Sequence, residues 1–184
     1  MATPSDRGPL TAVIIAFVIM VTVAVMVYLL IPHKITNLSV SSVDVFAPHT
    51  EFNASQESVH VVGETAQSED DLYVVAHINI TDKLSQPVII TGWSATVTFA
   101  DGSTLDSTYI AKSELPRLEQ IFPQISKLAT NPVGDGDEVN PGATETGSIV
   151  LLFPNTTQDK WNKKGSAVLT VELRDHTSQT VKLP

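Results

Sequence analysis

The hydrophobic pattern of the chain changes abruptly after its amino-terminal segment. Leu10 to Ile31 is an apolar run of twenty-two residues that contains two threonines and no charged residue, Asn, Gln, Gly or Pro. As a helix that rises about 1.5 Å per residue, the run would reach about 33 Å, enough to cross a hydrocarbon core of about 30 Å. The pattern therefore predicts a transmembrane helix over 10–31. The residues that mark this span are Leu10, Phe17, Tyr28 and Ile31.

A cleavable secretory signal is the main alternative interpretation of this run. Such a signal has an apolar core of about 7–15 residues followed by a small-x-small cleavage site. The run is longer than that, and the sequence Ile31-Pro-His-Lys-Ile-Thr-Asn37 after it offers no such site. Lipoprotein processing is excluded because the chain has no cysteine. We therefore expect an uncleaved anchor, followed by a linker over 32–36.

The orientation of the anchor depends on charge and size. The tail over 1–9 holds Arg7 and the α-amino group against Asp6, whereas residues 33–184 carry 19 acidic and 10 basic side chains. A long acidic segment gives the positive-inside rule nothing to retain in the cytoplasm. We expect a single-pass protein of the cytoplasmic membrane, with the tail inside and the remainder on the periplasmic or extracellular face.

Beyond the anchor, apolar residues recur with a period of two, as in strands with one buried face. The clearest case is 72–81, in which Leu72, Val74, Ala76, Ile78 and Ile80 alternate with more polar residues. Further segments with strand character are 93–99, 105–110, 149–153, 167–173 and 181–183, and Val59, Val61 and Val62 suggest another short strand. Asp101-Gly102 favours a tight hairpin between two of these segments.

A strand over 36–46 needs a bulge. Leu38 and Val40 share one parity, whereas Val43 and Val45 share the other. One extra residue between the two pairs would keep all four side chains on the same face.

Seven or eight short strands separated by turn signals are typical of an antiparallel sandwich. We predict a mainly β fold, with one immunoglobulin-like β-sandwich over 37–184. A domain of about 150 residues buries a sufficient core without disulfides, which agrees with the absence of cysteine.

Residues 111–140 interrupt the strand pattern. Ser113 is a suitable helix N-cap, and apolar residues follow at helical spacing before Pro123 ends the first helix or begins a second turn. Long insertions in compact domains often carry function. Residues proposed for contact with a partner are Leu115, Arg117, Leu118, Phe122 and Ile125. The alternative is that these apolar side chains only cover one open end of the sandwich.

No catalytic residue, metal ligand or cofactor site is assigned from the sequence. The chain has no cysteine nucleophile, G-x-S-x-G, H-E-x-x-H, Walker loop or G-x-G-x-x-G. Two acidic clusters, 69–71 and 135–138, lack the spacing of a calcium loop, so solvated loops are expected, with weak calcium binding as the alternative. The five histidines, which show no metal spacing, are His33, His49, His60, His77 and His176. His77 lies within a predicted strand and is expected to be half-exposed.

The net charge and the sequons give two further expectations. The formal net charge is −9 and the chain has no basic stripe, which argues against nucleic acid as a partner. Four N-glycosylation sequons begin at Asn37, Asn53, Asn79 and Asn155. These would carry glycans only in a host with the necessary machinery, and otherwise are ordinary polar residues.

The stretch from Leu72 to Val88 resembles the strand-turn pattern of uncharacterised bacterial envelope domains of the DUF4352-like, telokin-like type. The turn at Pro141-Gly142, followed by a strand containing Gly147 and ending at Phe153, matches a later element of the same pattern. The complete arrangement is similar to small single-span proteins of acidobacterial type. The resemblance implies an immunoglobulin-like fold and brings no assigned activity.

The expected function is that of a non-enzymatic, membrane-anchored module for protein–protein interaction, such as an accessory subunit of a larger envelope complex. Its expected partners are the lipid bilayer and either other envelope proteins or copies of itself. A self-assembling stalk or filament subunit is the alternative. A metal-dependent hydrolase that uses Asp135 and Asp137 is a third and weaker hypothesis.

Overall fold

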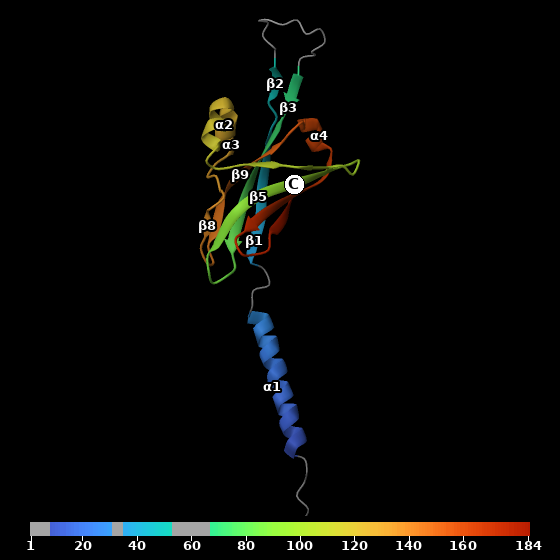
Figure 1. Cartoon of the computed structure of the whole chain (residues 1–184), viewed down its shortest axis with the longest axis vertical. Helices are drawn as coiled ribbons and strands as arrows, with labels where there is room; N and C mark the ends of the chain where they lie inside the picture. The colour runs from blue at the N-terminus through green and yellow to red at the C-terminus, as the bar shows by residue number, and fades with distance from the viewer. Residues whose placement is uncertain (1–7, 31–34, 53–66) are drawn as a thin grey trace, which may run out of the picture. The chain divides into compact units, whose positions relative to one another are not determined.

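The computed structural model describes residues 8–30, 35–52 and 67–184, and it divides into two compact units, Met1–Lys34 and Ile35–Pro184. The first unit contains one helix, α1 (Gly8–Leu30) (Figure 1). Pro9 is tolerated there because proline in the first turn costs no intrahelical hydrogen bond. The described side chains of α1, from Ala12 to Tyr28, are all exposed.

Among the described residues, no helix combines the length and the apolar character that crossing a membrane requires. The membrane span predicted over Leu10–Ile31 is therefore not supported by the described residues. Ile31, the last residue of the predicted span, lies outside the described residues.

The second unit is a sandwich of two antiparallel sheets with short helices (Figure 1). One sheet has the order β1-β4-β9-β7, and the other has the order β11-β10-β5-β6, with β8 paired to β5. The strands of the sandwich are β1 (Thr36–Phe46), β4 (Leu72–Asp82), β5 (Val88–Phe99), β6 (Thr104–Asp106), β7 (Thr108–Ile110), β8 (Glu138–Val139), β9 (Thr144–Phe153), β10 (Lys164–Leu173) and β11 (Gln179–Leu183). The helices of this unit are α2 (Leu115–Ile121), α3 (Pro123–Leu128) and α4 (Gln158–Asn162). A separate two-stranded pair consists of β2 (His49–Phe52) and β3 (Gln67–Asp70).

The main core lies between the two sheets, where the alternation predicted from the sequence is confirmed. In β4, Val74, Ile78 and Ile80 are fully buried, as are Val97 in β5 and Leu169 in β10. These branched side chains suit a pleated surface that is packed on one face.

The bulge predicted in the first strand is confirmed. The pairing of β1 with β4 shifts register between Val40 and Ser42, so that Ser41 is the additional residue. The Ser41 hydroxyl donates to the carbonyl of His77 at 3.1 Å. The shift brings both halves of β1 against the same core with one face inward.

The predicted return strand over 105–110 requires a correction, because it is two strands in different sheets. β6 pairs with β5, whereas β7 pairs with β9 of the opposite sheet. Ser107 makes the crossing: its N–H donates to the carbonyl of Ala95, and its hydroxyl accepts from the Ala95 N–H, both at 2.8 Å. Ser107 thus pairs both the N–H and the carbonyl of Ala95 in β5 at the point where the chain leaves that sheet.

Over 47–70, the structure leaves one predicted strand untested and adds a pair of strands that the sequence did not predict. The short strand expected around Val59, Val61 and Val62 lies outside the described residues. The pair of β2 and β3 was not predicted, since neither strand shows an apolar alternation.

Candidate functional site

The helical insertion forms a cap on the outer face of the β1-β4-β9-β7 sheet. The cap consists of α2, α3 and the turn at Phe122 between them. Its apolar side chains and those of the sheet form a second hydrophobic cluster, separate from the main core. The fully buried or nearly buried members are Tyr73, Val75, Leu115, Ile125, Ala129 and Val150. Of the two interpretations of the insertion, covering the sandwich therefore describes most of its apolar side chains, although they cover a sheet face rather than an open end.

Three aromatic rings join the cap to the sheet. Phe122 lies 5.6 Å from Phe46 of β1 and 5.5 Å from Tyr73 of β4, measured between ring centroids, and Phe46 lies 6.3 Å from Tyr73. Such tilted and edge-to-face pairs add to the free energy gained by burying apolar area. Phe122 therefore serves chiefly to fix the turn of the cap on the sheet.

The five residues proposed for partner contact occupy three different environments. Leu115 is 4% exposed and Ile125 is 0% exposed, so in this conformation neither side chain has surface to offer a partner. Leu118 and Phe122 are partly buried, and Arg117 is exposed. Ile121, which is not among the five predicted contact residues, lies on α2 and is 62% exposed. Among the described residues of the β unit, Ile121 is the one large hydrophobic residue whose side chain is largely exposed.

The loop after the cap is fixed to the sheets by polar contacts. Asp137 accepts hydrogen bonds from the Lys112 ammonium at 3.1 Å and from the Gly134 N–H at 2.9 Å. The backbones of Gly136 and Asp137 exchange hydrogen bonds with Ile90 of β5. This loop contains the acidic segment 135–138. Within it, the Asp137 carboxylate already has an ammonium group and a backbone N–H as partners.

Tyr109 of β7 lies beside this loop. Burial raises the pKa of the Tyr109 hydroxyl above its ordinary value of 10.0, and the negative charge of Asp135 adds to the shift. The neutral phenol is thus the form favoured by the fold.

An Asp–His–Ser alignment crosses three adjacent strands, but its chemistry is structural. His77 Nε2 lies 3.0 Å from Asp44 Oδ2, and His77 is the register partner of Ser148 in β9. The Ser148 hydroxyl is fully buried and donates to the Thr130 carbonyl at 2.7 Å. A nucleophile needs access to substrate and a base that accepts its proton. Ser148 lacks that access because it is fully buried, and its hydroxyl instead holds the end of the cap to β9.

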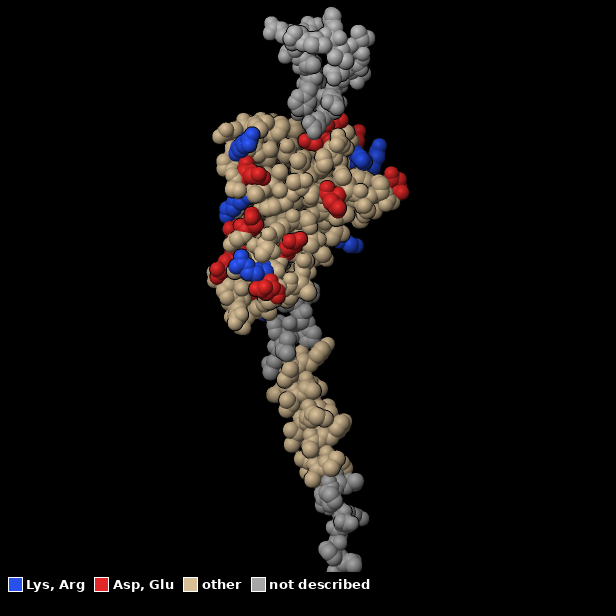
Figure 2. Space-filling view, in the orientation of Figure 1, with Lys and Arg blue, Asp and Glu red and all other residues tan. Residues whose placement is uncertain are grey.

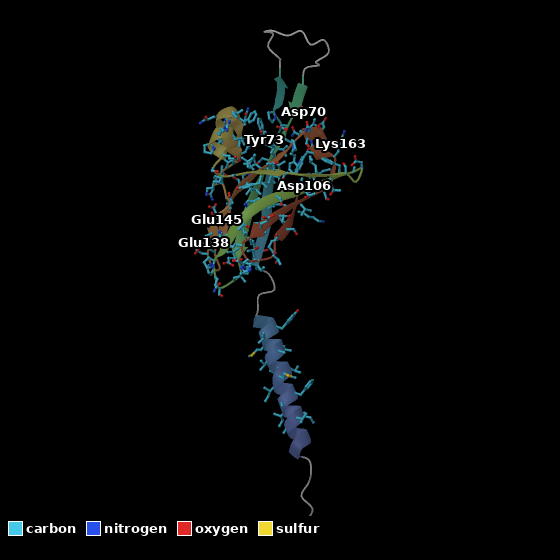
Figure 3. All side chains as sticks on the ribbon, viewed as in Figure 1. Asp70, Tyr73, Asp106, Glu138, Glu145 and Lys163 are labelled. Atoms are coloured by element: carbon cyan, nitrogen blue, oxygen red, sulfur yellow. The ribbon has the colours of Figure 1, made fainter. Side chains whose placement is uncertain are left out.

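The remaining charged side chains form no assembled centre in the described part of the chain. No group of three or more His, Asp or Glu residues lies close enough there to hold a metal ion. Two lysine ammonium groups near α4 lie over aromatic rings: Lys160 Nζ is 4.4 Å from the Phe99 ring centroid, and Lys164 Nζ is 4.5 Å from that of Trp161. Lys163 is exposed next to α4, where Figure 3 labels it.

The other single-residue predictions have the following positions. His77 is partly exposed, His176 is exposed, and His33 and His60 lie outside the described residues, as does Asn53. The Asn79 side chain accepts a hydrogen bond from Thr146 at 2.7 Å. Asn37 and Asn155 are exposed.

Comparison with known proteins shows similarity to uncharacterised bacterial β-sandwich proteins and gives no family. An uncharacterised β-sandwich protein from Clostridium difficile 630 aligns over 84% of this chain and 89% of its own, with 15% identity and a TM-score of 0.37. A functionally unknown protein from Listeria monocytogenes EGD-e aligns over 82% of this chain and 80% of its own, with 9% identity and a TM-score of 0.33. No family model and no curated protein matches the chain.

Proposed function

We propose that this chain is a non-enzymatic, membrane-anchored interaction module, an accessory subunit of a larger envelope complex. The anchor is the run over 10–31, the tail over 1–9 is cytoplasmic, and the sandwich lies on the periplasmic or extracellular face. Single-span envelope proteins with a telokin-like, immunoglobulin-type domain provide the analogy for this arrangement.

The observation that carries the proposal is the exposure of α1. Val18, Ile19 and Met20 are consecutive residues that are each more than 50% exposed, and successive side chains of a helix point about 100° apart, so exposed apolar side chains face different sides of α1. A helix that is apolar on all sides is normally buried in a protein core or in lipid. The full apolar run in the sequence is twenty-two residues long, which supports lipid as the cover.

The surface proposed for the protein partner is the outward side of the cap, with Arg117 and Ile121 at its centre and Leu118 and Phe122 beside them. A single exposed apolar residue is ordinary on a protein surface. Its position supports the proposal: it lies on a long insertion, beside an arginine, a residue type enriched at interface hot spots.

Photo-cross-linking in native membranes tests this surface. The photoreactive residue p-benzoyl-phenylalanine replaces Ile121 in one variant of the full chain and Glu172, exposed on β10, in a matched control. The proposal expects a discrete adduct with a different protein from position 121 and none from position 172. Equal labelling at both positions, or none at 121, would contradict it.

The same experiment separates the proposal from self-assembly. An adduct of twice the 19.8 kDa chain would favour the stalk or filament hypothesis, in which copies of the chain contact one another.

A further inference from the structure

The pair β2–β3 is an arm that continues the β1–β4 ladder in one register. Phe46 pairs with Tyr73, and the next described pair, His49 with Asp70, follows without a slip across the two residues between them. Pro48 lies in this gap, where its missing N–H removes one ladder hydrogen bond. Figure 1 shows β2 and β3 extending beyond the other strands of the β unit.

Within the described ranges, neither strand of the arm pairs with a third strand. Among the described residues, β2 pairs with β3 alone, while the pairing of β4 with β9 starts at Leu72. β3 is joined to the body by a hydrogen bond from the Thr156 N–H to the Asp70 carbonyl, at 2.7 Å. A two-stranded ribbon is marginal alone, and its outer backbone groups can pair with another chain.

The arm is acidic: Glu51 lies in β2, Glu69 and Asp70 lie in β3, and Asp71 follows directly. The stretch of chain that contains the arm also carries most of the net charge. Residues 35–82 contain eight acidic residues and no lysine or arginine, whereas residues 83–184 contain eleven acidic and nine basic residues. Figure 2 shows acidic side chains where the arm leaves the body, and Asp70 is labelled there in Figure 3. A second copy would bring the same charge to the same edge, which disfavours pairing between arms.

We propose that the arm binds an extended, lysine- or arginine-containing segment of a partner protein by strand addition. Backbone hydrogen bonds to a free edge of the arm would supply the affinity, and opposite charge would select the partner. This site is distinct from the cap surface, so the proposal stands whether or not the cap binds a protein.

The test uses the full chain in neutral detergent and three synthetic peptides as probes. The first alternates lysine and valine, the second alternates glutamate and valine, and the third is the first peptide with alternate backbone nitrogens methylated. Binding is measured by fluorescence anisotropy at low salt, and the bound region is located by amide hydrogen exchange. We expect the lysine peptide to bind at least about tenfold more tightly than either of the other two, and to protect amides of 49–52 or 67–70.

Matched variants complete the test. Replacing Glu51→Gln together with Glu69→Gln should weaken binding of the lysine peptide by about threefold or more, whereas Glu138→Gln with Glu172→Gln should leave it unchanged. The proposal fails if the methylated peptide binds as well as its parent, because charge alone then explains the binding. It also fails if protection lies outside the arm, or if the chain dimerises through the arm without any peptide.

Discussion

Gly147 shows how one residue without a side chain allows the loop after the cap to lie against the sheet. A Cβ atom at this position would overlap the carbonyl oxygen of Asn131, and Val133 lies almost as close. The loop is held there by two hydrogen bonds: the Ser148 N–H donates to the Asn131 carbonyl, and the Asn131 side-chain amide donates to the Thr146 carbonyl. The turn at Pro141-Gly142 can be predicted from the sequence. The close approach at Gly147 cannot, because it depends on contact with the separate loop segment around Asn131.

Substituting Gly147→Ala should lower the free energy of unfolding by about 1–3 kcal/mol, because the backbone of the loop must move to admit the methyl group. Urea titration of the full chain in detergent measures the change. Thr104→Ala, at an exposed position in β6, is the control and should change stability by less than about 0.5 kcal/mol. Similar stability of the two variants would mean that the loop yields without cost.

Tyr109 should make stability fall at alkaline pH. Because its folded-state pKa is raised, the stability it contributes is present below 10.0, the ordinary pKa of tyrosine, and is lost as pH rises toward and through the folded value. The free energy of unfolding, measured as a function of pH, should decline less steeply in Tyr109→Phe. The other two tyrosines, Tyr28 and Tyr73, are present in both proteins, so an identical decline would exclude this role.

At the scale of elements, the sequence predicts each regular strand better than it predicts its neighbours. The alternation in 72–81 specifies β4 because both faces of this strand are defined by burial: one face meets the opposite sheet and the other meets the cap. The division of 105–110 between two sheets could not be predicted, since it depends on hydrogen bonds between Ser107 and Ala95 of another strand. The helical spacing around Leu115 and Leu118 predicts α2, but not the sheet face that α2 covers.

The cap itself supplies a prediction that separates structural from exposed residues. Ile125→Ala should destabilise the chain by about 2–5 kcal/mol, because the side chain is fully buried against the sheet. Arg117→Ala and Ile121→Ser should change the free energy of unfolding by less than about 0.5 kcal/mol. Chemical denaturation measures all three. A large loss of stability from either exposed substitution would show that it has a structural role, and would weaken the cap surface as a docking site.

At the scale of the whole molecule, the two units differ in whether their apolar residues are buried. The β unit buries its apolar residues internally, whereas α1 exposes them along its described length. The sequence reveals this contrast directly, because the uniform run over 10–31 and the alternation beyond it differ in period.

The anchor proposal predicts that the full chain stays with membranes during an alkaline carbonate wash. Val18→Arg together with Val21→Arg should release it, because each arginine near the centre of a span costs about 2.5–3.5 kcal/mol of insertion free energy. The same two charges placed at Ser178 and Thr180, which are exposed, are the control and should not release it. Release of the unaltered chain by the wash would contradict the anchor.

The absence of lysine and arginine between Lys34 and Lys83 has a practical consequence for anyone who studies this protein. Trypsin leaves residues 35–83 as one long acidic peptide, so routine mass spectrometry will under-represent the strands from β1 to β4. Amine-reactive reagents have no lysine to modify there either. Carbodiimide coupling to carboxylates will label this part of the molecule, and a glutamate-specific protease will digest it, where lysine-directed reagents and trypsin do not.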